Sequence, residues 1–188
     1  MMTEDALIDA AVRLADIRGW SCETLRRALI EAGEPPELLP SAFPRGVTGA
    51  IAAWSRLADR RMQDAAERED FSGLRTPARI RRVVELRLRE VEPHREAVRG
   101  AMALLALPWN LPLAARLTAE TASALWYAAG DRSADFSWYT RRATLGAIYA
   151  ATLAYWLRPG GGDLEEALAF LDRRLAALPK PKPQPVEV

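Results

Sequence analysis

Apolar residues recur at intervals of three and four positions along nearly the whole chain, and this periodicity is the strongest constraint on its fold. No segment alternates apolar and polar residues over the length of a strand, and no Asn-Gly or Asp-Gly pair marks a hairpin turn. Gly and Pro residues divide the pattern into about nine segments. With 188 residues, 49% of them hydrophobic, the chain can bury a substantial core. The sequence therefore predicts an all-α fold of about nine helices.

Caps, glycines and prolines bound the expected helices. Ser21 and the Thr76-Pro77 pair are typical helix starts, and Gly19 and Gly33 are typical helix ends. We expect helices over about 3–18, 22–32, 35–40, 47–68, from 76, from 93, and over 113–129, 133–157 and 163–178. In the eighth, residues 143–157 are apolar or small nearly all round, which predicts a buried central helix.

Composition excludes several classes of function. One cysteine, Cys22, and one histidine, His94, cannot build a structural zinc site or a di-iron site, and no disulfide can form within the chain. We expect Cys22 to pack as a small apolar residue. No catalytic constellation is present, so we expect neither an enzyme nor a bound cofactor. A net charge of +1 argues against a nucleic-acid partner.

Residue usage also indicates where the protein works. Alanine is abundant, and Lys180 and Lys182 are the only lysines beside many arginines, which is typical of a GC-rich bacterial genome. The opening MMTEDALIDA has no basic leader and no apolar core of a signal peptide. We expect a cytoplasmic bacterial protein, with peripheral contact to the inner membrane as an open alternative.

The first 45 residues have a helix-turn-helix layout. The stretch LIDAAVRLADIRGWSCETLRRALIEAGEPPELLPSAFPRG resembles the N-terminal domain of TetR-type repressors. A helix that reads DNA needs cationic or amide side chains, but GEPPELLPSAFP offers Glu34 and Glu37 instead. We therefore interpret residues 1–45 as a retained scaffold, followed by a helical region over 46–178 and a disordered Pro-rich tail over 179–188.

The expected fifth helix is strongly basic. Its arginines lie mostly away from the apolar face formed by Ile80, Val84, Leu88 and Val91. They comprise Arg75, Arg79, Arg81, Arg82, Arg87 and Arg89. A solvated helix face explains them, and a weak footprint for anionic lipid headgroups or an acidic protein is the alternative.

The stretch DRSADFSWYTRR, residues 131–142, begins the expected eighth helix. Ser133 or Asp135 can cap its free N–H groups, and the acids favour the positive helix end. Phe136 falls on the core side of the helical wheel. Trp138 falls beside the arginines, where helical periodicity alone leaves a contact surface and ordinary core packing both open.

A family resemblance favours the contact surface. AAGDRSADFSWYTRRATLGAIYAATLAYWL, followed by EEALAFLDRRLAAL, resembles the signature region of the coenzyme Q accessory proteins, the ninth COQ protein and its alphaproteobacterial relatives. Ser137 departs from the usual Asn of that pattern. The resemblance implies a TetR-like fold whose pocket holds an isoprenoid lipid, a quinone precursor or a phospholipid. It also implies that the protein presents the precursor to a hydroxylase of ubiquinone biosynthesis, which is a di-iron enzyme in eukaryotes.

The resemblance and the helical pattern together nominate two sets of residues. The expected partner surface comprises Asp131, Asp135, Trp138, Tyr139, Arg141 and Arg142. The expected lipid-binding residues are apolar or aromatic side chains of the sixth to eighth helices. They are Met102, Leu105, Trp109, Leu113, Leu117, Leu125, Trp126, Ile148, Tyr149 and Trp156.

The ninth helix carries a leucine seam at intervals of four and three residues, from Leu164 to Leu178. Packing within the chain and pairing with a second copy both explain this seam. By analogy with TetR-type proteins we expect a homodimer. A TetR-type ligand-responsive transcriptional regulator remains the alternative function.

Overall fold

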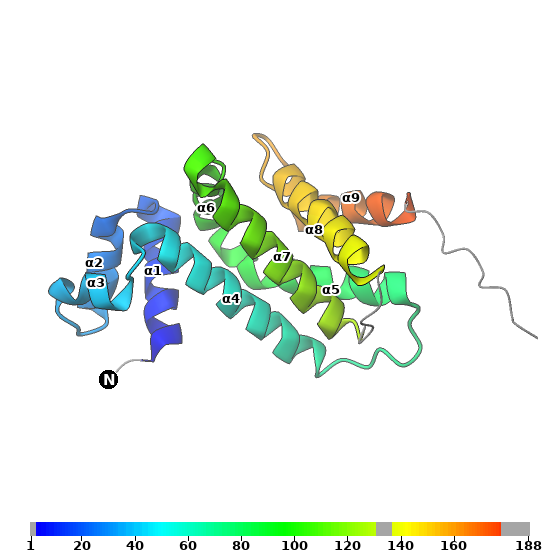
Figure 1. Ribbon diagram of the computed structural model, residues 1–188, viewed down its shortest axis with the longest axis horizontal. Coiled ribbons are helices and arrows are strands. Elements are labelled where there is room, and N and C mark those ends of the chain that lie inside the picture. Colours follow the sequence, from blue (N-terminus) through cyan, green and yellow to red (C-terminus); the bar gives the residue numbers. More distant parts are fainter. Residues whose placement is uncertain (1–2, 131–136, 178–188) are drawn as a thin grey trace, which may run out of the picture.

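The computed structural model describes residues 3–130 and 137–177, and of Ser137 and Trp138 it describes the backbone. Within these ranges the chain is helical, without strands, so the predicted all-α class is confirmed (Figure 1). The α-helices are α1 (Glu4–Arg18), α2 (Cys22–Glu31), α3 (Leu39–Ala42), α4 (Gly46–Ala66), α5 (Thr76–Val91), α6 (Arg95–Leu105), α7 (Leu111–Ala128), α8 (Ser137–Trp156) and α9 (Leu164–Ala176). Short 3-10 turns, η1 (Pro36–Leu38), η2 (Glu92–His94) and η3 (Pro108–Asn110), precede α3, α6 and α7.

Several helix ends follow the expected local chemistry. The Ser21 side chain accepts a hydrogen bond from the backbone N–H of Thr24 at the start of α2. Gly19, with φ of 77°, and Gly33, with φ of 74°, occupy the left-handed region after α1 and α2. Thr76 and Pro77 begin α5 as predicted, but the cap residue is Arg75, and no side chain caps that end. Cys22 is exposed, so the expectation that it packs in the core is wrong.

The chain is arranged as two packed groups of helices. Figure 1 shows α1, α2 and α3 at one end of the molecule and α8 and α9 at the other, with α4 and α7 running between them. The N-terminal group has its own small core, which includes Leu25, Leu29 and Phe43. At the position of a DNA-reading helix, α3 has only four residues.

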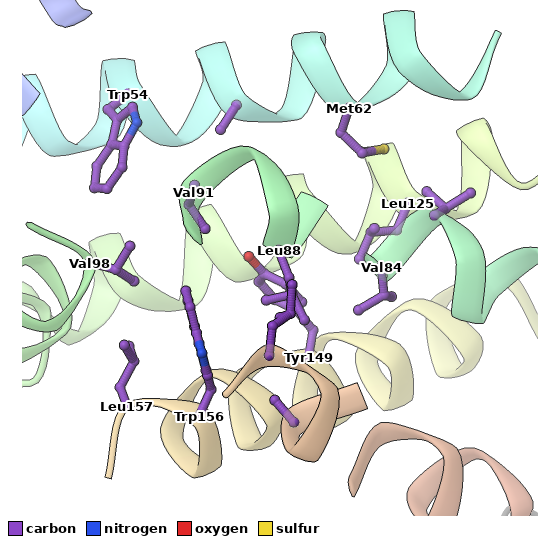
Figure 2. Close-up of a cluster of buried hydrophobic side chains, with 14 of the residues drawn as sticks. Trp54, Met62, Val84, Leu88, Val91, Val98, Leu125, Tyr149, Trp156 and Leu157 are labelled. Atoms are coloured by element: carbon purple, nitrogen blue, oxygen red, sulfur yellow. The ribbon is translucent and has the colours of Figure 1, made fainter. Parts of the chain in front are cut away.

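The larger core lies among α4 to α9 and includes Ile8, Val12 and Ala15 of α1. The predicted buried faces of α4, from Ile51 to Met62, and of α5, from Ile80 to Val91, are confirmed. Figure 2 shows α5 side chains lying between Trp54 of α4 and Trp156 of α8. These helices therefore meet through the apolar stripes that the sequence indicates.

Helix α8 is not buried all round, contrary to the prediction. It packs against α7 and α9, and its other side leaves Ala143, Ala147 and Ala154 exposed. Gly146 is buried against α7, where an added Cβ would lie 3.2 Å from Cγ2 of Thr118. Small residues thus serve two purposes on α8, because those facing α7 permit close packing and those on the opposite side lie at the surface.

The leucine seam of α9 is used within the chain. Leu164, Leu168 and Leu171 are buried in the larger core, and Leu175 packs partly against it. Leu178 lies outside the described residues. Packing against α5 and α8 therefore accounts for the described part of the seam.

The basic residues of α5 are largely neutralised by carboxylates. Glu85 is buried and forms ion pairs with Arg81, Arg82 and Arg89. Burial would raise the pKa of Glu85, but the hydrogen bonds from Arg89 and Arg82 outweigh it and hold that pKa below its ordinary value. Arg87 is buried, so the expectation of a solvated arginine face fails at this position.

Replacing Glu85 with glutamine is expected to lower the free energy of unfolding at pH 7 by about 2 kcal/mol, because a buried carboxylate loses charged hydrogen bonds. The folded pKa of Glu85 is lowered, so its stabilisation is complete above the ordinary pKa of 4.5 and disappears as the pH falls through the folded value. Urea unfolding of the wild type and Glu85→Gln at pH 7 and pH 4 measures this. The difference between the two proteins should shrink at pH 4; an equal difference at both values would contradict the assignment.

Candidate functional site: an apolar cavity with a buried polar end

A cavity of about 280 Å³ lies between α4, α5, α6, α7 and α8. Most of its wall is apolar and includes Ile51, Trp54, Val91 and Leu153. One face of α7 forms a continuous side of the cavity through Leu111, Ala114, Leu117, Thr118 and Thr121. These residues follow the three- and four-residue spacing of one helix face. The cavity therefore runs along α7 rather than across it.

The cavity has a buried end and an outer end. Trp54, Arg87, Thr121 and Tyr149 line it and are buried. Its outer wall is formed by partly exposed residues of α6, α7 and α8, together with Leu111, which is exposed. They are Met102, Leu105, Ala114, Thr118, Ala150 and Leu153. A ligand would enter at the outer wall and meet the buried residues last.

A hydrogen-bonded ion pair lies at the buried end. Nε of Arg87 donates to Oδ1 of Asp59 at 2.7 Å, and Nη2 donates to the Ser55 carbonyl oxygen at 3.3 Å. The Thr121 hydroxyl lies 3.0 Å from Oδ2 and 3.2 Å from Oδ1 of Asp59. Burial would lower the pKa of Arg87, but the charge of Asp59 and its hydrogen bond favour the charged guanidinium, and that pKa stays above its ordinary value. Arg87 therefore stays charged inside the protein.

Tyr149 lies beside this ion pair and also lines the cavity. Figure 2 shows its side chain reaching from α8 toward α5, near Leu88 and Val91. Burial raises the pKa of the Tyr149 hydroxyl, and the positive charge of Arg87 opposes this effect only in part. At neutral pH the hydroxyl is therefore protonated and can donate a hydrogen bond.

The predicted lipid-binding residues are divided between the cavity and its surroundings. Met102, Leu105, Leu117 and Tyr149 line the cavity. Three others, Leu125, Ile148 and Trp156, are buried in the larger core outside its wall. Trp126 and Leu113 are partly buried, Trp109 is exposed, and none of these three lines it. Lipid contact at all ten positions remains a prediction.

Sequence reasoning missed the polar end of the cavity. Arg87 lies four residues after Val83 and four before Val91, within a row of buried side chains. Thr121 has the same position between Leu117 and Leu125. In each helix the polar residue and its two apolar neighbours lie on one face. A polar residue between two buried apolar residues at this spacing therefore indicates a buried polar group.

The predicted partner surface is only partly described. Asp131 and Asp135 lie outside the described residues, as do Ser133 and Phe136. The backbone of Trp138 belongs to the first turn of α8, and its side chain is not among those described. Tyr139 is 74% exposed. Arg141 and Arg142 are partly exposed, and the Arg141 carbonyl accepts a hydrogen bond from Nε1 of Trp126 on α7.

A second hollow, of about 320 Å³, lies between α1, α2 and α3. It is lined by Thr3, Leu7, Leu29 and neighbouring residues, and Leu29 alone is buried. None of its polar lining residues is buried, so it lacks the enclosed polar groups that orient a ligand.

The chain is similar in sequence to known proteins. The model of the COQ9 family matches residues 111–180. The human mitochondrial ubiquinone biosynthesis protein COQ9 is 29% identical over 176 residues, which are 90% of this chain and 55% of the human protein. The Drosophila melanogaster protein of the same name is 27% identical over 173 residues, which are 90% of this chain and 53% of that protein. Residues 111–180 of the chain are therefore similar to the COQ9 family.

The COQ9 match covers α7, α8 and α9, and so it includes the α7 wall of the cavity, Tyr149 and the residues of the predicted partner surface. Asp59 and Arg87 lie outside residues 111–180. The chain spans about half the length of the COQ9 relatives described above. Xenopus tropicalis COQ9 is more similar over a shorter stretch, with 39% identity over 97 residues, which are 52% of this chain and 31% of that protein.

The fold of the chain is TetR-like. A TetR transcriptional regulator from Nitrosomonas europaea superimposes with a TM-score of 0.72 and 24% sequence identity, covering 92% of this chain and 95% of the regulator. Among the described residues, no single helix has the length and apolar character to cross a membrane. Residues 76–105 and 108–128 meet those two criteria only as a pair, which is bent by 95°.

Proposed function

We propose that this chain is a non-enzymatic accessory protein of ubiquinone biosynthesis that binds a prenylated quinone precursor or a related isoprenoid lipid in its cavity. The observation that carries the proposal is an apolar cavity with a polar end, enclosed by five helices of a chain whose residues 111–180 match the COQ9 family. The matched relatives are named as ubiquinone biosynthesis proteins. The protein then presents the precursor by releasing it from the cavity to a hydroxylase that modifies its ring.

The size and chemistry of the cavity support an amphiphilic ligand. Its 280 Å³ lies near the lower limit of ligand sites, which hold roughly 300–1,000 Å³. A ring with a short length of chain suits this volume, and the rest of a long polyprenyl chain would extend past the outer wall. Apolar side chains predominate on the wall, which favours a ligand that is mostly hydrocarbon.

A ligand-responsive transcriptional regulator is the second candidate, because the fold is TetR-like. The short segment of η1 and α3, residues 36–42, argues against it, since it carries no arginine, lysine, asparagine or glutamine to reach base edges in the major groove. The exposed Glu37 would also face DNA phosphates with the wrong sign. We therefore favour lipid binding without DNA binding.

Lipid extraction separates these two functions. We expect organic extracts of the purified protein to contain a prenylated lipid in near-stoichiometric amount, identified by mass spectrometry. A protein that carries no lipid and shifts a specific DNA fragment at physiological salt would instead support the regulator.

We propose that the start of α8 contacts the hydroxylase through Trp138, Tyr139 and the neighbouring charged residues. The exposure of Tyr139 supports this surface, since aromatic residues beside arginines are enriched at protein interfaces. Trp138→Ala is expected to weaken hydroxylase binding by roughly 30-fold, the typical effect of removing an interfacial hot-spot side chain. The measurement is binding of the purified hydroxylase by calorimetry.

The control for this prediction is Ile30→Ala, which shortens an exposed apolar side chain on α2. This variant should bind the hydroxylase like the wild type. Thermal unfolding should show that Trp138→Ala keeps its fold and its lipid. If Trp138→Ala unfolds, or if it binds the hydroxylase normally, the partner surface is misplaced.

Two further contacts belong to the proposal. The exposed Ala143, Ala147 and Ala154 provide a flat row on α8 that suits a second copy of the chain, so sedimentation should give a mass near twice 20.8 kDa. Leu111, at the outer end of the cavity, is 53% exposed, and Trp109, two residues earlier, is 74% exposed; an exposed aromatic residue suits a membrane interface. Flotation with anionic vesicles measures that contact; protein that stays unbound at low salt would exclude it.

A further inference from the structure

We infer that Arg87 and Tyr149, held in place by Asp59 and Thr121, form a headgroup subsite that takes an oxygen-bearing ring, such as a quinone or a phenol, with the ring inward and the isoprenoid chain outward. This inference rests on the proposed lipid-binding function and specifies the chemistry of the ligand. Both residues line the cavity, and each is 5% exposed.

At the buried end of the cavity, hydrogen-bond donors outnumber hydrogen-bond acceptors. A guanidinium has five N–H bonds, and Arg87 uses Nε for Asp59 and Nη2 for Ser55. Among residues 3–130 and 137–177, neither Nη1 of Arg87 nor the Tyr149 hydroxyl donates a hydrogen bond. The matching ligand group is therefore an acceptor, and ring carbonyl or hydroxyl oxygens meet this requirement.

Asp59 positions Arg87 but does not line the cavity. Its Oδ1 accepts from Arg87, and both of its oxygens lie within hydrogen-bonding distance of the Thr121 hydroxyl. The carboxylate thus fixes the guanidinium against α4 and balances its charge. An apolar pair of similar volume would join the same helices without the cost of removing two charges from water. The retained ion pair is consistent with a binding role rather than with stability alone.

The positions of these groups along α7 set the orientation of the ligand. Thr121 marks the buried polar end of the cavity and Leu111 the exposed apolar end. Ten residues of helix separate them, which corresponds to roughly 15 Å. A ring bound at Arg87 and Tyr149 therefore places its chain along Leu117, Ala114 and Leu111, toward the outer wall.

This arrangement discriminates by headgroup. A hydrocarbon or acyl chain that reached the buried end would offer no acceptor and would leave the buried donors unpaired, which costs binding free energy. An isoprenoid ring compound with oxygen substituents would satisfy them. The cavity should therefore prefer a prenylated quinone to a hydrocarbon of the same shape.

The test uses delipidated full-length protein and two probes that differ only in ring oxygens. One is a benzoquinone that carries a two-isoprene chain, and the other is a benzene ring with the same chain. Calorimetry should show that Tyr149→Phe weakens binding of the quinone by roughly 3- to 10-fold, the effect of one hydrogen bond, and leaves binding of the benzene analogue unchanged. Tyr155→Phe is the matched control, because Tyr155 lies on α8 outside the cavity and stacks on Phe170.

A second variant removes the charged part of the subsite. The double substitution Asp59→Leu with Arg87→Met removes the charged groups but keeps Tyr149, so it should reduce the preference for the quinone to the share that Tyr149 contributes. The inference is overturned if Tyr149→Phe affects both probes equally or neither, or if the double variant keeps the full preference of the wild type. If neither probe binds the wild type, the proposed lipid-binding function itself fails, and this outcome is distinct from loss of discrimination.

Discussion

Replacing Asp59 with leucine is expected to lower the free energy of unfolding by about 3–5 kcal/mol, because it leaves the charge of Arg87 buried without a partner. Arg87 and Asp59 are 5% and 6% exposed, so water cannot replace the lost carboxylate. In a chain of this size the midpoint of thermal unfolding should fall by roughly 10 °C. Circular dichroism during thermal and urea unfolding measures both quantities.

Two companion variants isolate the cause. Asp64 lies on the exposed side of the same helix, so Asp64→Leu should change stability by less than about 0.5 kcal/mol. The double variant Asp59→Leu with Arg87→Met should recover most of the lost stability, because it removes both charges. A double variant as unstable as Asp59→Leu alone would show that packing, rather than the unpaired charge, causes the loss.

Replacing Ala114 with phenylalanine is expected to lower the lipid content of the purified protein at least tenfold. Ala114 lies on the cavity wall, one turn after Leu111 on the way to Thr121 on α7, so a benzyl group there would occupy the path of the chain. A tenfold loss corresponds to about 1.4 kcal/mol of binding free energy. Stability should change by less than about 2 kcal/mol, since the new side chain fills existing space. Mass spectrometry of organic extracts measures the lipid.

The neighbouring residue supplies a matched control. Ala115 is exposed on the same turn of α7 and does not line the cavity. Ala115→Phe adds the same side chain outside the cavity and should retain the lipid. Equal lipid content in the two variants would place the ligand elsewhere, for example in the hollow between α1, α2 and α3.

Helical periodicity predicted the framework because it depends on local spacing. The stripes of α4 and α5 are regular and long, and side chains such as Trp54 and Val84 have one suitable place, which is the core. The same reasoning placed Met102, Leu105, Leu117 and Tyr149 on helices that meet around one cavity. Periodicity could not distinguish these four residues from Leu125 or Trp156, because an apolar side chain is equally compatible with a cavity wall and with a packed core.

The remaining errors have physical causes. Alanine is compatible with burial and with exposure, so an alanine-rich α8 gave no information about its exposed side. Arg81 and Arg82 of the same basic helix pair near the surface, whereas the burial of Arg87 depends on its pairing with Asp59, which is distant in sequence. Contacts between residues far apart in sequence leave little trace in local patterns.

Ubiquinone content tests the central claim most directly. In the source organism, deletion of this gene should lower ubiquinone and lead to accumulation of a prenylated precursor that lacks a ring hydroxyl, both quantified by mass spectrometry. The wild-type chain and Ala115→Phe should restore ubiquinone, and Ala114→Phe should not. Unchanged ubiquinone after deletion, or full restoration by Ala114→Phe, would contradict the proposal that this chain supplies ubiquinone biosynthesis with a lipid held in its cavity.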